Sequence, residues 1–103
     1  MDEHQRRVWA RMIEEIKRFR DGEIELRKLV QDLQGLMGGA DLHDGDLIDE
    51  FWNHEAPIDM ELELRTEQWA PEGSASDARL EQALTEFAEW AQRILDTTDD
   101  DRV

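Results

Sequence analysis

Apolar residues in this chain recur at spacings of three and four residues, which is the period of one face of an α-helix. The stripe over residues 3–20 consists of Trp9, Met12, Ile13, Ile16 and Phe19. A second stripe covers residues 25–37, and the clearest one runs through a last helix to about residue 96. Amphipathic helices bury their apolar faces by packing on one another. The pattern therefore predicts an all-α fold, an antiparallel bundle of three to four helices with short loops.

Turn residues predict where these helices begin and end. Gly22 suits the left-handed position after a helix, so the first helix is expected to end there. Gly38 and Gly39 are expected to stop the second helix. Ser74, with Asp77 three residues later, resembles a capping box and predicts the start of the last helix.

The third helix contains the ambiguous part of the chain. It is expected to begin near Asp46, with Asp44 or Asp46 as its N-cap. Pro57 either kinks this helix or begins a new one, because proline in a helix interior costs about 3 kcal/mol. Residues 58–64 alternate apolar and charged side chains as a strand does, but no second alternating run supplies a partner strand. A helix is favoured, and a strand that pairs with another molecule is the alternative.

The composition limits the class of protein. The 103 residues suffice for one domain, predicted to span residues 1–96, with a disordered acidic tail over residues 97–103. There is no cysteine, which excludes disulfides and cysteine-ligated metals. The first twenty residues are charged throughout, and no segment reaches the roughly 18 consecutive apolar residues of a membrane span. We therefore expect a cytoplasmic protein with no leader and no membrane contact.

The net charge of −15 lies entirely after residue 37. Residues 1–37 carry eight acidic and eight basic side chains, whereas residues 38–103 carry nineteen acidic and four basic ones. The negative potential of these acidic residues repels nucleic acid and attracts basic protein surfaces. A tryptophan next to acidic residues is typical of a binding hot spot for a basic partner. The predicted partner contacts lie in residues 41–63 and are Asp44, Asp46, Asp49, Glu50, Trp52, Glu55, Asp59 and Glu61.

Two other interpretations of this charge stay open. The carboxylates can be a solvated helix surface, or can face the arginines of the first helix, with Trp52 closing one end of the core. The charge asymmetry between the two parts of the chain also allows basic and acidic faces of two copies to meet. In that case the protein is a self-associating structural bundle, and we expect a monomer or a homodimer.

Catalytic and metal-binding patterns are weak. Residues 41–50 resemble a calcium loop in composition, but starting from either Asp41 or Asp44 the EF-hand spacing is not satisfied. None of the three histidines lies at a metal-binding spacing, and no nucleophile is accompanied by a base. We expect no enzyme activity, no bound metal and no cofactor, and a divalent-metal-binding protein is the remaining alternative.

One segment resembles a known group of proteins. The residues that carry the resemblance are Ile16, Phe19, Gly22, Ile24 and Leu29, followed by the sequence Asp-Leu-Gln-Gly-Leu over residues 32–36. Over about residues 12–37 the chain is similar to the start of small acidic bacterial helical proteins, some of which are immunity proteins for colicin-type nucleases. The resemblance implies a helical bundle that binds and blocks a basic nuclease toxin through its carboxylates.

Overall fold

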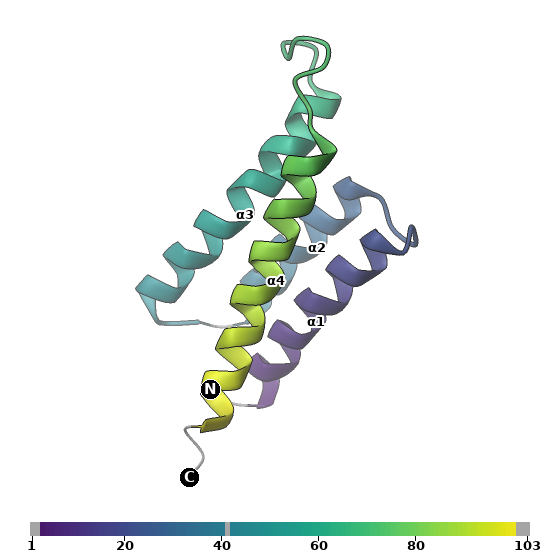
Figure 1. Ribbon diagram of the computed structural model, residues 1–103. Helices are drawn as coiled ribbons and strands as arrows, with labels where there is room; N and C mark the ends of the chain where they lie inside the picture. The colour runs from purple at the N-terminus through teal and green to yellow at the C-terminus, as the bar shows by residue number, and fades with distance from the viewer. Residues whose placement is uncertain (1–2, 41, 101–103) are drawn as a thin grey trace.

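The computed structural model describes residues 3–40 and 42–100. Its four helices are α1 (Glu3–Arg20), α2 (Leu26–Gly39), α3 (Gly45–Thr66) and α4 (Asp77–Asp100) (Figure 1). No strand occurs in the described part of the chain. The prediction of an all-α bundle with short loops is confirmed.

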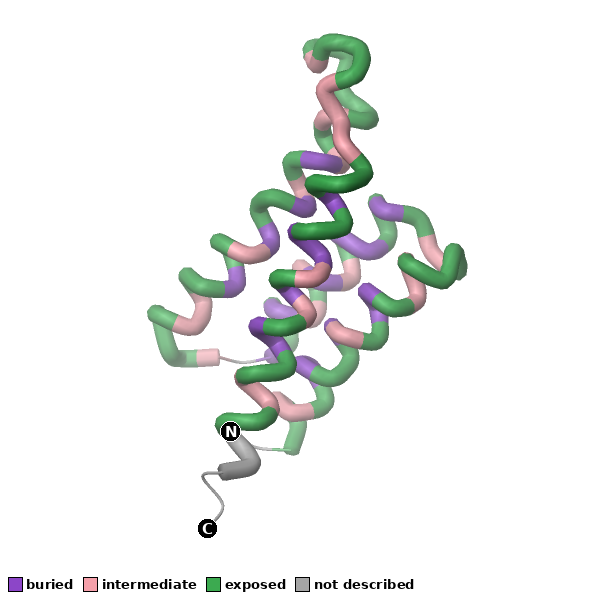
Figure 2. Tube along the Cα trace, in the orientation of Figure 1, coloured by how far each residue is buried: buried purple, intermediate pink, exposed green. Residues whose placement is uncertain are grey.

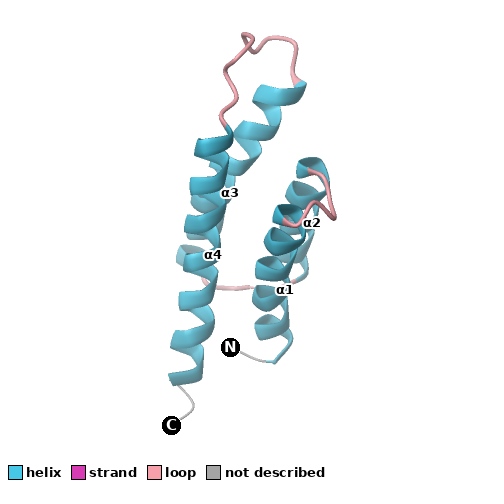
Figure 3. Cartoon of the chain, turned by 45° about the vertical axis from the view of Figure 1, so that its right-hand side comes forward, coloured by secondary structure: helices cyan, strands magenta, loops and turns pink. Residues whose placement is uncertain are grey.

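The four helices form two antiparallel hairpins that pack on each other. α1 contacts α2 and α4, and α3 contacts α2 and α4, so α1 and α3 occupy opposite corners of the bundle. Figure 3 shows the two hairpins as two layers, with the α3–α4 loop extending beyond the end of the α1–α2 hairpin. The molecule is correspondingly elongated, with principal extents of 52 × 28 × 20 Å.

The core is formed by the predicted apolar stripes, which face inward on all four helices (Figure 2). Its centre is a series of edge-to-face aromatic contacts. Trp9 of α1 lies 5.0 Å from Trp90 of α4, measured between ring centroids, and Phe87 joins Trp90 to Phe51 of α3. Such pairs contribute about 0.5–1.5 kcal/mol each beyond their buried area. Trp9 and Trp90 are therefore structural, as their positions on the stripes predict.

Glycines lie at the ends of the first two helices, as predicted. Gly22 has a φ of +79°, and the amide N–H of Glu23 donates to the carbonyl of Arg18 at 2.9 Å, which closes α1. Gly38 and Gly39 are the last two residues of α2, so this helix ends at the predicted pair, two residues after Met37. Glycine keeps helical backbone angles there, at a cost of about 1 kcal/mol relative to alanine.

The ambiguous segment is helical. α3 is one continuous helix through Pro57 and residues 58–64, which confirms the helix and excludes the strand. Alternation fails as a guide here because Ile58 is fully buried while Met60, two residues on, is 48% exposed. No helix in the described ranges is both long enough and apolar enough to cross a membrane.

The last helix starts and ends later than predicted. Its cap is Ser76, whose Oγ accepts a hydrogen bond from the backbone N–H of Arg79 at 3.2 Å. Ser74 lies in the preceding loop and does not cap α4, which corrects the capping-box prediction. α4 ends at Asp100, four residues beyond the predicted end, and residues 101–103 of the predicted disordered tail lie outside the described residues.

Candidate functional site

The start of α3 places three carboxylates in solvent. Asp44 is the N-cap, and its Oδ1 accepts hydrogen bonds from the backbone N–H groups of Asp46 at 3.0 Å and Leu47 at 3.3 Å. The side chains of Asp46, Asp49 and Glu50 follow on the exposed side of the first turns. Acidic side chains in this position also complement the positive end of the helix dipole.

The same outer surface continues along α3. Trp52 is 44% exposed, although its ring contacts Phe51 edge to face at 5.0 Å. Asp59 is half-buried and lies two helical turns further on the Trp52 side. Six of the eight predicted contacts are thus exposed or half-buried on the outside of α3 or at its N-cap, and we call this outer surface the acidic face: Asp44, Asp46, Asp49, Glu50, Trp52 and Asp59. Trp52 lies at its edge toward α2, and Glu50 lies at its edge toward α4. Met60 and Glu63 are also exposed on this side and were not predicted as contacts.

The acidic face is not neutralised by the basic helix. α3 carries seven acidic residues and one basic, and α1 carries six basic and three acidic, but the two helices lie at opposite corners. Four of the five arginines of α1, namely Arg7, Arg11, Arg18 and Arg20, form ion pairs with acids of α1, the following turn and α4. These acids are Glu3, Glu15, Glu23 and Glu81. Within the described ranges, no basic side chain forms an ion pair with Asp46, Asp49 or Glu50.

Glu55 belongs to the interior and not to the acidic face. It is 2% exposed, and its Oε1 accepts a hydrogen bond of 3.1 Å from the side-chain amide of Gln34 on α2. Burial raises the pKa of this carboxyl, the bond from Gln34 lowers it in part, and the charge of Asp59 raises it further. The prediction of Glu55 as a partner contact is therefore wrong for this conformation, because a partner cannot reach the side chain.

Glu55→Gln is expected to stabilise the protein by about 1 kcal/mol at pH 7, because glutamine keeps the acceptor and removes a buried charge. A raised pKa means that the folded state favours the protonated carboxyl. The stability contributed by Glu55 is thus fully present below its ordinary pKa of 4.5 and is lost as the pH rises through the folded-state value. Urea unfolding at pH 7 and pH 4 measures the free energy of unfolding of both proteins. The difference in favour of Glu55→Gln should be smaller at pH 4 than at pH 7. A variant less stable than the wild type at pH 7 would contradict it.

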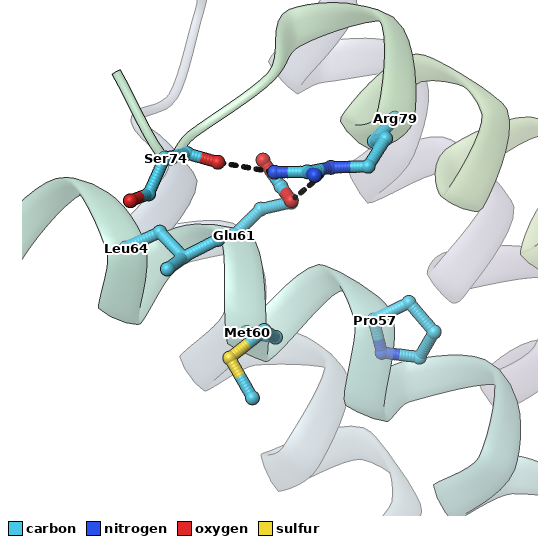
Figure 4. A pocket seen from close by; sticks show the side chains of 6 residues that line it. All are labelled: Pro57, Met60, Glu61, Leu64, Ser74 and Arg79. Atoms are coloured by element: carbon cyan, nitrogen blue, oxygen red, sulfur yellow. Dashed lines mark hydrogen bonds and ion pairs between the residues drawn. The ribbon is translucent and has the colours of Figure 1, made fainter. Parts of the chain in front are cut away.

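Glu61 is also internal and holds the α3–α4 connection in place. Its carboxylate is buried and accepts three hydrogen bonds, from Arg65 at 2.9 Å, from the backbone N–H of Ser76 at 2.9 Å and from Arg79 at 3.1 Å. Figure 4 shows the guanidinium of Arg79 between this carboxylate and the carbonyl of Ser74. The prediction of Glu61 as a partner contact is wrong for the same reason as that of Glu55.

A pocket of about 580 Å³ opens beside this cluster at the loop end of the bundle. Its lining is formed by Pro57, Met60, Glu61, Leu64, Ser74 and Arg79 (Figure 4). Burial alone would raise the pKa of Glu61, but the Ser76 N–H and the two guanidinium groups outweigh it and lower the pKa. The pocket thus holds a charged carboxylate whose oxygens are already occupied, an arrangement that suits a structural clamp.

A third buried carboxyl joins α1 to α2. Glu15 is 1% exposed, and its Oε1 lies 2.9 Å from Arg11 and 3.1 Å from Arg18. Burial raises the pKa of Glu15, and a hydrogen bond shared with Asp32 raises it further. The pKa of Asp32 is lowered by that bond and by Lys28, which lies 2.9 Å away. Sequence reasoning missed this pair because its two carboxyls lie on different helices.

Metal binding finds no support in the arrangement of side chains. Over residues 3–40 and 42–100, no group of three or more histidine, aspartate or glutamate side chains converges as metal ligands do. Asp44, one of the two starting positions considered for a calcium loop, uses its carboxylate as a helix cap.

Comparison with known proteins assigns no family. No protein-family model matches the chain, and no curated protein or solved structure is significantly similar to it.

Proposed function

We propose that the protein binds a cationic protein partner through the acidic face. The observation that carries this proposal is a row of exposed carboxylates along the outside of α3, the helix diagonally opposite the basic one, with the partly exposed Trp52 at the edge of the row. Within the described ranges, no ion pair involves Asp46, Asp49 or Glu50. Carboxylates that lie close together without basic neighbours repel one another, and this repulsion lowers the stability of the fold. A basic partner that binds over them would reduce the repulsion. Trp52 supplies the apolar contact that such interfaces use as an anchor.

The partner class follows from the same chemistry. A surface of carboxylates and an indole suits a protein whose own surface binds a polyanion, and a nuclease toxin is one such protein. In that case the protein acts as a substitute for the phosphate backbone and inhibits its partner by covering the cationic site. The resemblance of residues 12–37 to small acidic bacterial helical proteins, a group that includes immunity proteins for colicin-type nucleases, suggested this class of partner.

A capture experiment with matched baits tests the proposal. The immobilised baits are the wild type, a face variant (Asp49→Asn, Glu50→Gln, Asp59→Asn) and a control variant that removes three charges from the exposed side of α4 (Glu86→Gln, Glu89→Gln, Asp96→Asn). We expect one basic protein from a lysate of the source cells on the wild-type and control baits, released by salt and absent from the face variant. Equal recovery on all three baits, or no basic protein on any, would contradict the proposal.

A further inference from the structure

A groove between the second half of α2 and the first half of α3 adjoins the acidic face. It has a volume of about 350 Å³, and its lining residues are Gln34, Met37, Gly38, Leu42, Ile48 and Trp52. Four of these are apolar, and Trp52 belongs both to the groove and to the acidic face. The groove is therefore the place where apolar and acidic chemistry meet on this surface.

The α2 side of this groove is formed by Gln34, Met37 and Gly38, none of which is charged. A methyl group at Gly38 would meet no atom of a neighbouring helix within 4 Å, so packing inside the bundle does not require glycine there. Glycine at this position costs the helix about 1 kcal/mol relative to alanine. Glycine in such a position lets the backbone of another chain approach closely.

The charged side chains on the Trp52 side of α3 are all acidic. On α3, Asp49 lies one turn before Trp52, and Asp59 and Glu63 lie two and three turns after it on the same side of the helix. On the other side, α2 presents its C-terminus, where the helix dipole places partial negative charge. A cationic ligand with an apolar edge matches both features.

We infer that this groove binds an amphipathic helix of the cationic partner, with its apolar side chains on Met37, Ile48 and Trp52 and its lysines or arginines against Asp49, Asp59 and Glu63. The inference rests on the proposed function and specifies where and how the partner docks. A third helix fits between two antiparallel helices by the ordinary packing of side-chain ridges into grooves.

A second copy of this chain does not match the groove as well. Its basic helix is α1, but the apolar stripe of α1, which includes Trp9, Met12 and Ile16, is buried in its own core. A folded copy thus presents basic side chains without the apolar edge that the groove requires.

The test uses synthetic helical peptides of about four turns, or ~14 residues, as probes. The first carries leucine on one face and lysine elsewhere, the second replaces each leucine with alanine, and the third replaces each lysine with glutamate. Titration calorimetry at low salt measures binding to the wild type, to Gly38→Leu, which fills the groove, and to Gly38→Ala, which leaves it open. A Cβ atom at Gly38 would meet no atom within 4 Å, so Gly38→Ala is compatible with the fold, and circular dichroism checks that Gly38→Leu is folded before the titration.

We expect the leucine–lysine peptide to bind the wild type and Gly38→Ala alike, and to bind Gly38→Leu about tenfold or more weakly. The glutamate peptide should not bind. If the alanine–lysine peptide binds as tightly as the leucine–lysine peptide and Gly38→Leu binds as tightly as the wild type, the groove is not the docking site. The proposed binding of a cationic partner by the acidic face is not affected by that result. If neither lysine peptide binds, both proposals fail. A dimer in sedimentation that Gly38→Leu dissociates would assign the groove to a second copy and overturn the inference.

Discussion

Replacing Glu61 with alanine is expected to lower the free energy of unfolding by about 3 kcal/mol. The substitution leaves the N–H of Ser76 and the guanidinium groups of Arg65 and Arg79 without their shared acceptor. The value is at the low end for a buried ion pair because the Arg79 side chain is 59% exposed and regains water. Urea unfolding followed by circular dichroism measures the loss.

The matched control for this prediction is Glu63→Ala, since Glu63 is exposed on the same helix and no ion pair involves it in the described ranges. Its effect should stay within about 0.5 kcal/mol. A loss below about 1 kcal/mol for Glu61→Ala would show that the clamp contributes little.

Acid should weaken the same clamp. The pKa of Glu61 is lowered in the folded state, so the stability it contributes is present above its ordinary value of 4.5 and is lost as the pH falls below that value. Glu61→Gln removes this titration, and its stability relative to the wild type should therefore improve from pH 5 to pH 3. A difference that does not change with pH would contradict the assignment.

Neutralising Asp49, Glu50 and Asp59 together is expected to slow association with the basic partner by about 10–100-fold at low ionic strength. These side chains create the field that the partner meets before contact, because no basic residue in the described ranges pairs with Asp49 or Glu50. The dissociation rate should change less, since long-range attraction acts mainly on approach. Stopped-flow kinetics with the captured partner at several salt concentrations measure both rates.

The α4 variant serves as control here as well. It removes the same number of charges, so an effect of total charge alone would slow both variants equally. We expect less than about a threefold change for the control, and a salt dependence that becomes flatter for the face variant only. Equal slowing of the two variants would place the recognition outside the acidic face.

The helices could be predicted from the sequence because their apolar residues repeat with the period of a helix, but their ends depend on local contacts. Gly38 and Gly39 are the last two residues of α2 and not the first two beyond it, because glycine can adopt helical backbone angles when the preceding turn is helical. Ser76 rather than Ser74 caps α4 because the loop before it is fixed by the bonds of Glu61 and Arg79, which join residues up to 18 positions apart. Spacing along the chain does not contain such information.

The acidic face could be predicted in part. The density of acidic residues can be counted from the sequence, and most acidic residues are exposed in folded proteins. Glu55 and Glu61 were misplaced since acidic residues are ordinarily exposed. A sequence signal for Glu55 existed: it lies four residues after Phe51 and three before Ile58, on the same apolar stripe. Glu61 had a weaker signal in Arg65, four residues later, but its partners Ser76 and Arg79 come from another helix and its preceding loop.

Because α1 and α3 lie at opposite corners of the bundle, the charge of the molecule is distributed unevenly, and an electric field orients it. α1 has a net charge of +3, whereas α3 and α4 carry seven acidic residues each and have net charges of −6 and −5, so the bundle has a permanent dipole moment across its short axes. A cationic surface that approaches from any side exerts a torque on this dipole and turns the α3–α4 hairpin toward itself before the two proteins touch. The order in which the helices pack thus selects which face arrives first.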